Sequence, residues 1–259
     1  NETNEPSLKN TYKTTAEYRI QARVKRLFAQ GIKEYHLINP SDHILVGLSG
    51  GKDSMALLDL LCEWKRHMMP GTLRLTAAHI TMKHIGYESD IQYLHKFTTQ
   101  LGVPFETEEV EFTKDTKEGR TPCFLCSWNR RKKLFEIAQQ LGCNKIALGH
   151  HQDDILATTL MNLTFTGSFS TMPVFLAMRK IPITLIRPLC KIAESDLNDW
   201  QKIRQYQQVS KRCPFEHESN RTHIRKLLQD MEQLNTDYRY NIWRALEKED
   251  KLVEKYCML

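Results

Sequence analysis

Residues 46–54 read VGLSGGKDS, and this stretch predicts how the surrounding chain folds. It overlaps an apolar run at 44–48 that is long enough for one buried strand, and it leads into a helical pattern with apolar side chains on one face. The two glycines let backbone N–H groups approach a ligand, and the first turn of a helix adds partial positive charge. Since Lys52 and two serine hydroxyls supply further donors, the stretch predicts an anion site that suits a phosphate chain.

The stretch is not a Walker loop, which needs a glycine five residues before a second glycine that is followed by Lys and Ser or Thr. Here the residue five before Gly51 is Val46, and Lys52 is followed by Asp53. SGGKDS resembles instead the pyrophosphate loop of the adenylating PP-loop family, whose members split ATP between the α and β phosphates and leave AMP on a substrate oxygen. The alternative is a glycine turn that binds nothing. The ATP-binding residues that the resemblance implies are Ser49, Gly50, Gly51, Lys52, Asp53 and Ser54, with Lys52 and Asp53 also catalytic.

The composition bounds the class of protein. The chain has 259 residues, of which 41% are hydrophobic and 26% charged, a balance ordinary for a globular protein. No apolar run approaches the roughly 18 residues of a membrane-spanning helix, and the N-terminus is polar and unlike a signal sequence. We therefore expect a cytoplasmic protein without membrane association. In that compartment the seven cysteines are expected to be thiols, ligands or redox groups, not structural disulfides.

Strand and helix patterns alternate through the middle of the chain. Strands are expected at 44–48, 73–80, 104–110, 145–148 and 183–187, and helices at 18–35, 52–64, 87–101, 129–141 and 151–163. This alternation predicts an α/β fold with a parallel sheet and helices on both faces. The resemblance of SGGKDS to the PP-loop implies that this fold is Rossmann-like and similar to that of PP-loop and adenine nucleotide α-hydrolase proteins. We expect an N-terminal arm and helix at 1–40, an ATP-binding domain at 41–192, and a helical, basic region at 193–259.

Ligands of open parallel sheets bind beyond the carboxyl ends of the strands. Ser49, Thr81 and Gly149 each follow an expected strand, so we expect them to share one cleft, with Lys52 pointing into it. The backbone near Ile80 is a candidate adenine contact, and Gly149 is counted with the ATP-binding residues. The Ile80 side chain itself fits a plain core strand equally well.

The run GHHQDD at 149–154 joins an expected strand to an expected helix. Histidines followed by aspartates suit metal ligation, and Asp153 is a candidate for holding Mg²⁺ against the ATP phosphates. The alternative is that Asp153 or Asp154 caps the helix that follows. Both interpretations stay open on the residues alone.

Cys123 and Cys126 form a CxxC motif, which presents two thiolates to one metal or forms a redox pair. No second CxxC or His pair completes a zinc site, and Cys213 stands alone later in the chain. Three thiolates favour an iron–sulphur cluster with one open iron, or a catalytic cysteine set that includes Cys213. Zinc completed by His217, or unliganded thiols, are the alternatives.

The formal charge of +6 permits a polyanionic partner but does not establish one. Two basic runs adjoin the cysteines, one after the CxxC motif and one before Cys213. A single run is more often a solvated helix face, whereas two runs beside cysteine sites favour a nucleic acid. The candidate RNA-binding residues are Arg130, Arg131, Lys211 and Arg212.

With these pieces placed, the chain resembles the bacterial tRNA 2-thiocytidine synthetase family (TtcA) from about residue 23 to residue 246. The resemblance rests on SGGKDS, RTPCFLCSWNRR at 120–131, KIALGHHQDDILATTLMNL at 145–163, IRPL at 186–189, Cys213, and NIWRAL at 241–246. It implies ATP-dependent replacement of the C2 oxygen of a cytidine by sulphur, at position 32 of tRNA. It also implies a 4Fe-4S cluster on Cys123, Cys126 and Cys213. As further partners we expect a cysteine desulfurase or other sulphur donor, and a second copy of the chain in a homodimer.

The chain departs from the family pattern at several positions. The family usually has PCxxCGSQ after the last strand, and here Glu216 takes the place of the second cysteine. Trp128 and Ala157 replace an arginine and a glutamate of the family motifs. These departures leave open the exact tRNA target. The rival interpretations are a PP-loop thiolase for another RNA base that uses persulphide on Cys213, an amidating or lysidine-forming ligase, and a metal-containing RNA-binding module without catalysis.

Overall fold

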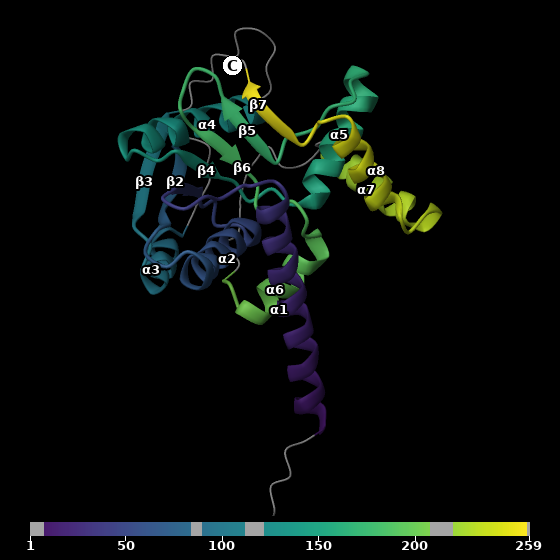
Figure 1. Cartoon of the computed structure of the whole chain (residues 1–259), viewed down its shortest axis with the longest axis horizontal. Helices are drawn as coiled ribbons and strands as arrows, with labels where there is room; N and C mark the ends of the chain where they lie inside the picture. Colours follow the sequence, from purple (N-terminus) through teal and green to yellow (C-terminus); the bar gives the residue numbers. More distant parts are fainter. Residues whose placement is uncertain (1–7, 84–89, 112–121, 208–219, 258–259) are drawn as a thin grey trace, which may run out of the picture.

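The computed structural model describes residues 8–83, 90–111, 122–207 and 220–257 (Figure 1). Within them, seven strands form one sheet in the order β3-β2-β1-β4-β6-β5-β7. The strands are β1 (His43–Gly47), β2 (Arg74–Lys83), β3 (Phe105–Glu111), β4 (Lys145–Ala147), β5 (Phe175–Met178), β6 (Thr184–Ile186) and β7 (Val253–Cys257). The helices are α1 (Leu8–Glu34), α2 (Lys52–Met68), α3 (Ile91–Leu101), α4 (Pro122–Gln140), α5 (Gln152–Thr166), α6 (Glu194–Arg204), α7 (Asn220–Leu234) and α8 (Tyr238–Lys248). The expected α/β class is confirmed.

The sheet is parallel except at one pair. In the described sheet β5 runs antiparallel to β6, and every other neighbouring pair is parallel. The sequence pattern predicts neither β5 nor β7, and it predicts helix as far as residue 256. Strand β7 reads VEKYC, and charged residues of this kind are common on edge strands because they discourage further pairing. The C-terminal region thus adds a strand to the sheet of the preceding region.

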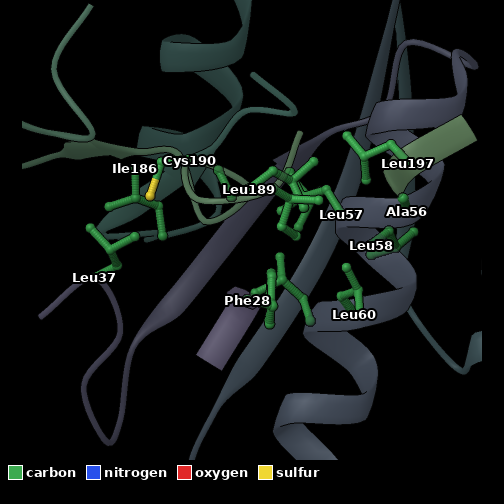
Figure 2. Close-up of a cluster of buried hydrophobic side chains, with 14 of the residues drawn as sticks. Phe28, Leu37, Ala56, Leu57, Leu58, Leu60, Ile186, Leu189, Cys190 and Leu197 are labelled. Carbon is green, nitrogen blue, oxygen red and sulfur yellow. The ribbon is translucent and has the colours of Figure 1, made fainter. Parts of the chain in front are cut away.

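Strand β1 separates two apolar cores. Ile44 and Val46 contribute to one core and Leu45 to the other, because successive strand residues point to opposite faces. The first core takes side chains from α1, α2, α5 and α6, and Figure 2 shows Phe28 of α1 and Leu197 of α6 within it. The second core lies under α4. The expected helices on both faces of the sheet are therefore confirmed.

The strand order reverses between β1 and β4. From β1 the chain proceeds to β2 and β3 on one side, and it later returns to β4 and β6 on the other. Val46 pairs with Ala77 of β2 and with Ala147 of β4, so β1 and β4 end at a similar level, and β2 continues past them to Lys83. Such a reversal leaves a crevice between the loops that follow the two central strands, and ligands of open α/β sheets bind there.

The C-terminal helices α7 and α8 lie against α5 (Figure 1). Lys191, in the segment after β6, joins α8 to the end of α1. Its Nζ lies 2.7 Å from a carboxylate oxygen of Glu34, 3.3 Å from one of Glu247, and 4.9 Å from the ring centre of Trp243. Trp243 of the NIWRAL motif therefore has a structural role, because it contacts the lysine that joins α8 to α1. No helix among the described residues is both long enough and apolar enough to cross a membrane.

Candidate functional site

A cleft of about 350 Å³ opens at the crevice between β1 and β4. The glycine loop, the carboxyl ends of β1 and β4, the middle of β2, and residues of α4 and α5 line it. Of the residues expected to bind ATP, those in the lining are Ser49, Gly51, Asp53, Ser54, Ile80 and Gly149. Gly50 lies in the loop between two of them. The structure thus brings the expected nucleotide-binding residues together, with Lys52 as the exception.

The glycine loop holds its shape through its own hydrogen bonds. Gly50 has a φ of 80°, in the left-handed region that favours glycine. The Ser54 hydroxyl donates to the Gly51 carbonyl oxygen at 2.9 Å and accepts from the Ser49 backbone N–H at 3.1 Å. Helix α2 then begins with Gly51 as its N-cap and without a side-chain cap. The N–H groups of its first turn are therefore left for an anion.

Gly149 brings the end of β4 against the start of α2. A Cβ atom at this position would lie 3.0 Å from the Ser54 backbone nitrogen and 3.1 Å from the Asp53 carbonyl carbon. Both neighbours are backbone atoms of a helix, so neither can move aside easily. Glycine is therefore required here by the close approach of two backbones, beyond any contact that it makes with a nucleotide.

His79 of β2 lines the cleft near Arg130. Its side chain is buried, and its Nδ1 lies 2.6 Å from the Leu48 carbonyl oxygen, so Nδ1 carries the proton and donates. Burial lowers the pKa of His79 below its ordinary value of 6.5, and the positive charge of Arg130 lowers it further. The imidazole is therefore neutral at neutral pH, and the positive charge in this part of the lining comes from Arg130.

The two arginines after the CxxC motif have different surroundings. Arg130 is half-buried and lines the cleft, whereas Arg131 is exposed. The sequence pattern groups both with RNA binding. The geometry places Arg130 in the cleft lining and leaves Arg131 on the surface. Lys211 and Arg212, the other two candidate RNA-binding residues, lie outside the described residues.

Within the described part of the chain, Lys52 is absent from the cleft lining, although the sequence predicts that it points into the cleft. Its Nζ lies 3.1 Å from a carboxylate oxygen of Asp53 and 3.3 Å from Oε1 of Glu194. Glu194 is the first residue of α6 and is separated from Lys52 by 142 positions. Two carboxylates therefore hold the ammonium group at the edge of the cleft, and Lys52 is not in the lining that the described residues form.

The two aspartates of GHHQDD face different partners. Asp153 Oδ2 accepts from the Glu194 backbone N–H at 2.7 Å, and Asp153 Oδ1 pairs with Arg239 at 2.5 Å. Asp154 accepts at 3.2 Å from the backbone N–H at the N-cap of its own helix, and it lines the cleft. The carboxylates in the cleft lining are therefore those of Asp53 and Asp154. Asp153, the candidate for Mg²⁺, is absent from the part of this lining that the structure describes, and it forms an ion pair with Arg239.

The CxxC motif lies in the first turns of α4. The sequence pattern predicts a helix from Asn129, but α4 begins at Pro122, and proline is favoured at the first helical position because its missing N–H is not needed there. Cys126 packs against Met82 near the end of β2, and so does Val110 near the end of β3. The motif therefore lies at the carboxyl edge of the sheet, as the glycine loop does.

The rest of the expected cysteine site is beyond what the structure describes. Cys213 lies outside the described residues, and so does the side chain of Cys123. The three-cysteine site therefore stays a prediction, for which the position of Cys126 provides one observation.

Arg187 of the IRPL motif is a site residue to which the sequence pattern assigns no role. It is buried, its Nε donates to His150 Nδ1 at 3.3 Å, and its guanidinium also donates to the Pro173 carbonyl oxygen. Burial lowers the pKa of Arg187 to about 10, and the positive charge of Arg131 contributes to the lowering. Arg187 thus orients a histidine that lines the cleft. The motif itself is the signal that could have found it.

Comparison with known proteins identifies the family. The family model of the PP-loop domain (ATP_bind_3) matches residues 16–242. The tRNA-cytidine(32) 2-sulfurtransferase of Bordetella petrii is 34% identical over 235 residues, which are 89% of this chain and 72% of that protein. The protein of the same name from Acinetobacter baumannii is 32% identical over 90% of this chain and 78% of its own length.

Among solved structures, the fold is similar to that of U34-tRNA thiolase NcsA from Methanococcus maripaludis, determined with its [4Fe-4S] cluster. The TM-score is 0.74, and the match covers 94% of this chain and 83% of that chain at 23% identity. At this identity the likeness concerns the fold. The chain belongs to the PP-loop family and, within it, to the family of the tRNA-cytidine(32) 2-sulfurtransferases, which is the 2-thiocytidine synthetase family that its motifs resemble.

Proposed function

We propose that the chain is an ATP-dependent tRNA sulfurtransferase that converts cytidine 32 of the anticodon loop to 2-thiocytidine, the activity named for its relatives. One observation carries the proposal. The glycine loop presents the uncapped start of α2 to a cleft at the point where the strand order of the sheet reverses. A phosphate chain in that cleft would meet backbone N–H groups and the positive end of a helix dipole.

The chemistry follows from the weakness of the C2 oxygen as a leaving group. That oxygen attacks the α-phosphorus of ATP, a P–O bond forms, and the bond from the α-phosphorus to the bridging oxygen breaks with release of pyrophosphate. A sulphur nucleophile then adds to C2, and the C–O bond breaks with AMP as the leaving group. The N–H groups of the glycine loop, together with Arg130, would stabilise the charge that develops on the departing pyrophosphate.

Asp53 and Asp154 are the carboxylates best placed for Mg²⁺, because both line the cleft. Protein sites for Mg²⁺ typically use one or two carboxylates and leave the remaining positions to phosphate oxygens and water. Asp153 has the residue type but not the position, because it is absent from the described cleft lining that contains Asp53 and Asp154. We therefore assign the metal to the cleft aspartates.

Cys123, Cys126 and Cys213 are the residues that would hold a 4Fe-4S cluster. Residues three apart on a helix lie on the same face, so the position of the CxxC motif in α4 fits two ligands of one group. Three thiolates leave one iron without a protein ligand, and a bound cluster would supply that iron to hold sulphur. Iron and sulphide analysis after anaerobic reconstitution tests the assignment. We expect an oxygen-labile cluster, and strictly anaerobic protein that contains zinc and no iron would contradict it.

The tRNA would be held by its phosphates and read at one base. An anticodon-loop cytidine is single-stranded and can turn out of the stack into a pocket. Arg131 is exposed beside the CxxC motif, and it joins Lys211 and Arg212 as a candidate phosphate contact. The sulphur donor, expected to be a cysteine desulfurase or another carrier, and the homodimeric state stay predictions.

Mass spectrometry of nucleosides from tRNA tests the proposed function. In a strain that lacks the gene, we expect 2-thiocytidine to disappear, to return with the unaltered gene, and to stay absent with a Lys52→Ala gene. Loss of a different thiolated base would mean that the enzyme modifies another nucleotide. Unchanged tRNA in the deletion strain would refute the proposal.

A further inference from the structure

A second cavity, of about 580 Å³, lies beside the nucleotide cleft. Its lining mixes both signs of charge, with Arg23, Arg225 and Arg239 beside Glu194 and Asp196. Glu194 stands at the boundary between the two cavities, because its carboxylate also contacts the lysine of the glycine loop. The contact links the ATP cleft to helices that lie more than a hundred positions further along the chain.

The backbone that carries Glu194 is fixed from the opposite side. Its N–H donates to Asp153 Oδ2 at 2.7 Å, and the other oxygen of Asp153 pairs with Arg239 of α8. Helix α6 has Ala193 as its N-cap and no side-chain cap of its own, so Asp153 of α5 satisfies the first N–H group instead. The first turn of α6, and with it the Glu194 carboxylate, is therefore held in front of Lys52.

We propose that Glu194 is a positioning residue that holds Lys52 at the edge of the cleft and competes with the ATP phosphates for its ammonium group. The inference rests on the proposed function, because it takes bound ATP as the competitor. Lys52 Nζ lies 3.3 Å from Glu194 Oε1, and the two side chains are 20% and 31% exposed. The pair is accessible enough to be exchanged, and a triphosphate offers more negative charge than one carboxylate.

The alternative is that the pair only fastens α6 to α2. The two interpretations differ in what removal of the Glu194 charge does to ATP. If Glu194 competes for Lys52, its neutralisation frees the ammonium group and ATP binds more tightly. If the pair only fastens two helices, its neutralisation weakens the fold and ATP binding does not improve. Partly exposed ion pairs of this kind correspond to about a two- to five-fold change in a dissociation constant.

Titration calorimetry with ATP and Mg²⁺ on four proteins tests the proposal as a double-mutant cycle. The proteins are the unaltered chain, Glu194→Gln, Lys52→Ala and the double variant. We expect Glu194→Gln to lower the Kd for ATP about two- to five-fold in the unaltered background and to leave it unchanged in the Lys52→Ala background. In ATP–pyrophosphate exchange the change should fall on KM and not on kcat, because it alters ground-state and transition-state binding alike.

Glu232→Gln is the matched control. Glu232 lines the same cavity and lies 3.8 Å from Arg239, and within the described part of the chain its ion-pair partner is Arg239 and not Lys52. The control should leave the Kd for ATP unchanged. Thermal unfolding of every variant separates folding from binding, and Glu194→Ala provides a second variant if Glu194→Gln does not fold.

Each outcome of the titration decides the question. A Kd that Glu194→Gln leaves unchanged or raises would overturn the inference and leave the ATP site intact. An equal fall in the Lys52→Ala background would also overturn it, since the Glu194 charge would then act on ATP without Lys52. If the unaltered chain bound no ATP, the proposed function would fail together with the inference.

Discussion

The two neighbouring cavities of this molecule are assembled in different ways. The nucleotide cleft is lined largely by residues that follow one another at strand ends, in the glycine loop and in the turn after β4. The charged cavity beside it takes its lining from α1, α5, α6, α7 and α8, which lie far apart in the sequence. The first cavity contains the start of α2, which has no side-chain cap, whereas the second contains several side-chain ion pairs. Phosphate binding thus depends on local backbone shape, whereas the position of Lys52 depends on tertiary contacts.

Removal of Lys52, which contacts one carboxylate from the lining of each cavity, should have the largest effect. We expect Lys52→Ala to slow ATP–pyrophosphate exchange by about 100-fold or more, as loss of one donor to developing charge does in other enzymes. The fold should be unaffected, which circular dichroism would check. Lys65→Ala, in the last turn of the same helix, is the matched control. Normal exchange by Lys52→Ala would mean that the glycine loop works without its lysine.

A side chain at residue 149 should damage the cleft through its backbone. In Gly149→Ala the new Cβ would lie 3.0 Å from the Ser54 nitrogen, so we expect a loss of about 1–3 kcal/mol of unfolding free energy together with weaker ATP binding. Gly167→Ala is the control, because Gly167 has a φ of 65° and no neighbour within 4 Å of an added Cβ. It should lose stability and keep ATP affinity. Equal ATP affinities in the two variants would contradict the role of close backbone approach.

Loss of the Arg239 charge should affect the charged cavity and leave the cleft in place. We expect Arg239→Gln to lower the free energy of unfolding by about 1.5–3 kcal/mol, because Asp153 would lose a charged hydrogen-bond partner. Urea denaturation measures this change, and Glu232→Gln should cost less than about 1 kcal/mol, since Glu232 is half-exposed. If folded Arg239→Gln bound no ATP at all, ATP binding in the cleft would depend on the ion pairs of the charged cavity.

The neighbouring residues Arg130 and Arg131 offer a finer test. Because Arg130 lines the cleft and Arg131 is exposed, we expect Arg130→Ala to weaken ATP and Arg131→Ala to weaken tRNA. Loss of one phosphate contact should reduce the slope of log K against log salt for tRNA by about 0.7–0.9. If Arg130→Ala reduced this slope and left ATP affinity unchanged, Arg130 would belong to the RNA surface.

The smallest expected effect concerns acid stability. Burial lowers the pKa of His79 below 6.5, so the unfolded chain takes up this proton more readily than the folded chain. Stability is therefore retained above pH 6.5 and lost as the pH falls from 6.5 toward the lower folded-state pKa. His43, whose pKa burial also lowers, adds to the same loss. His79→Asn should reduce the difference between urea midpoints at about pH 7.5 and about pH 5.5, and an undiminished difference would assign it to other groups.

Much of the fold can be predicted from the sequence because its central strands are apolar runs that alternate with helical patterns. β1 and β2 are of this kind, and both were expected within a few residues. β5 and β7 escape prediction because they lie toward one edge of the sheet, where pairing is decided by neighbours. The early start of α4 escapes it because the helical pattern becomes evident only from residue 129, although Pro122 is of a residue type favoured at the first helical position.

The candidate site likewise contains residues whose positions can be predicted from the sequence and residues whose positions cannot. Ser49, Ser54 and Gly149 can be predicted to line the cleft because strand ends and a glycine turn specify their places locally. The direction of Lys52 cannot be predicted, because it depends on Glu194, which is brought to it only by the packing of α6 on α2. The partner of Asp153 is equally remote, since Arg239 lies 86 positions away. Sequence motifs identify the chemistry of a site more readily than the charge pairs that adjust it.

Transfer of oxygen from the base to AMP tests adenylation most directly. The substrate is tRNA that carries ¹⁸O at C2 of cytidine 32, supplied with unlabelled ATP and a sulphide source. If the C2 oxygen attacks the α-phosphorus, each 2-thiocytidine formed should be accompanied by one AMP that carries the heavy oxygen, and mass spectrometry of the nucleotides would detect it. Formation of 2-thiocytidine with unlabelled AMP, or with ADP and phosphate, would contradict adenylation of the base.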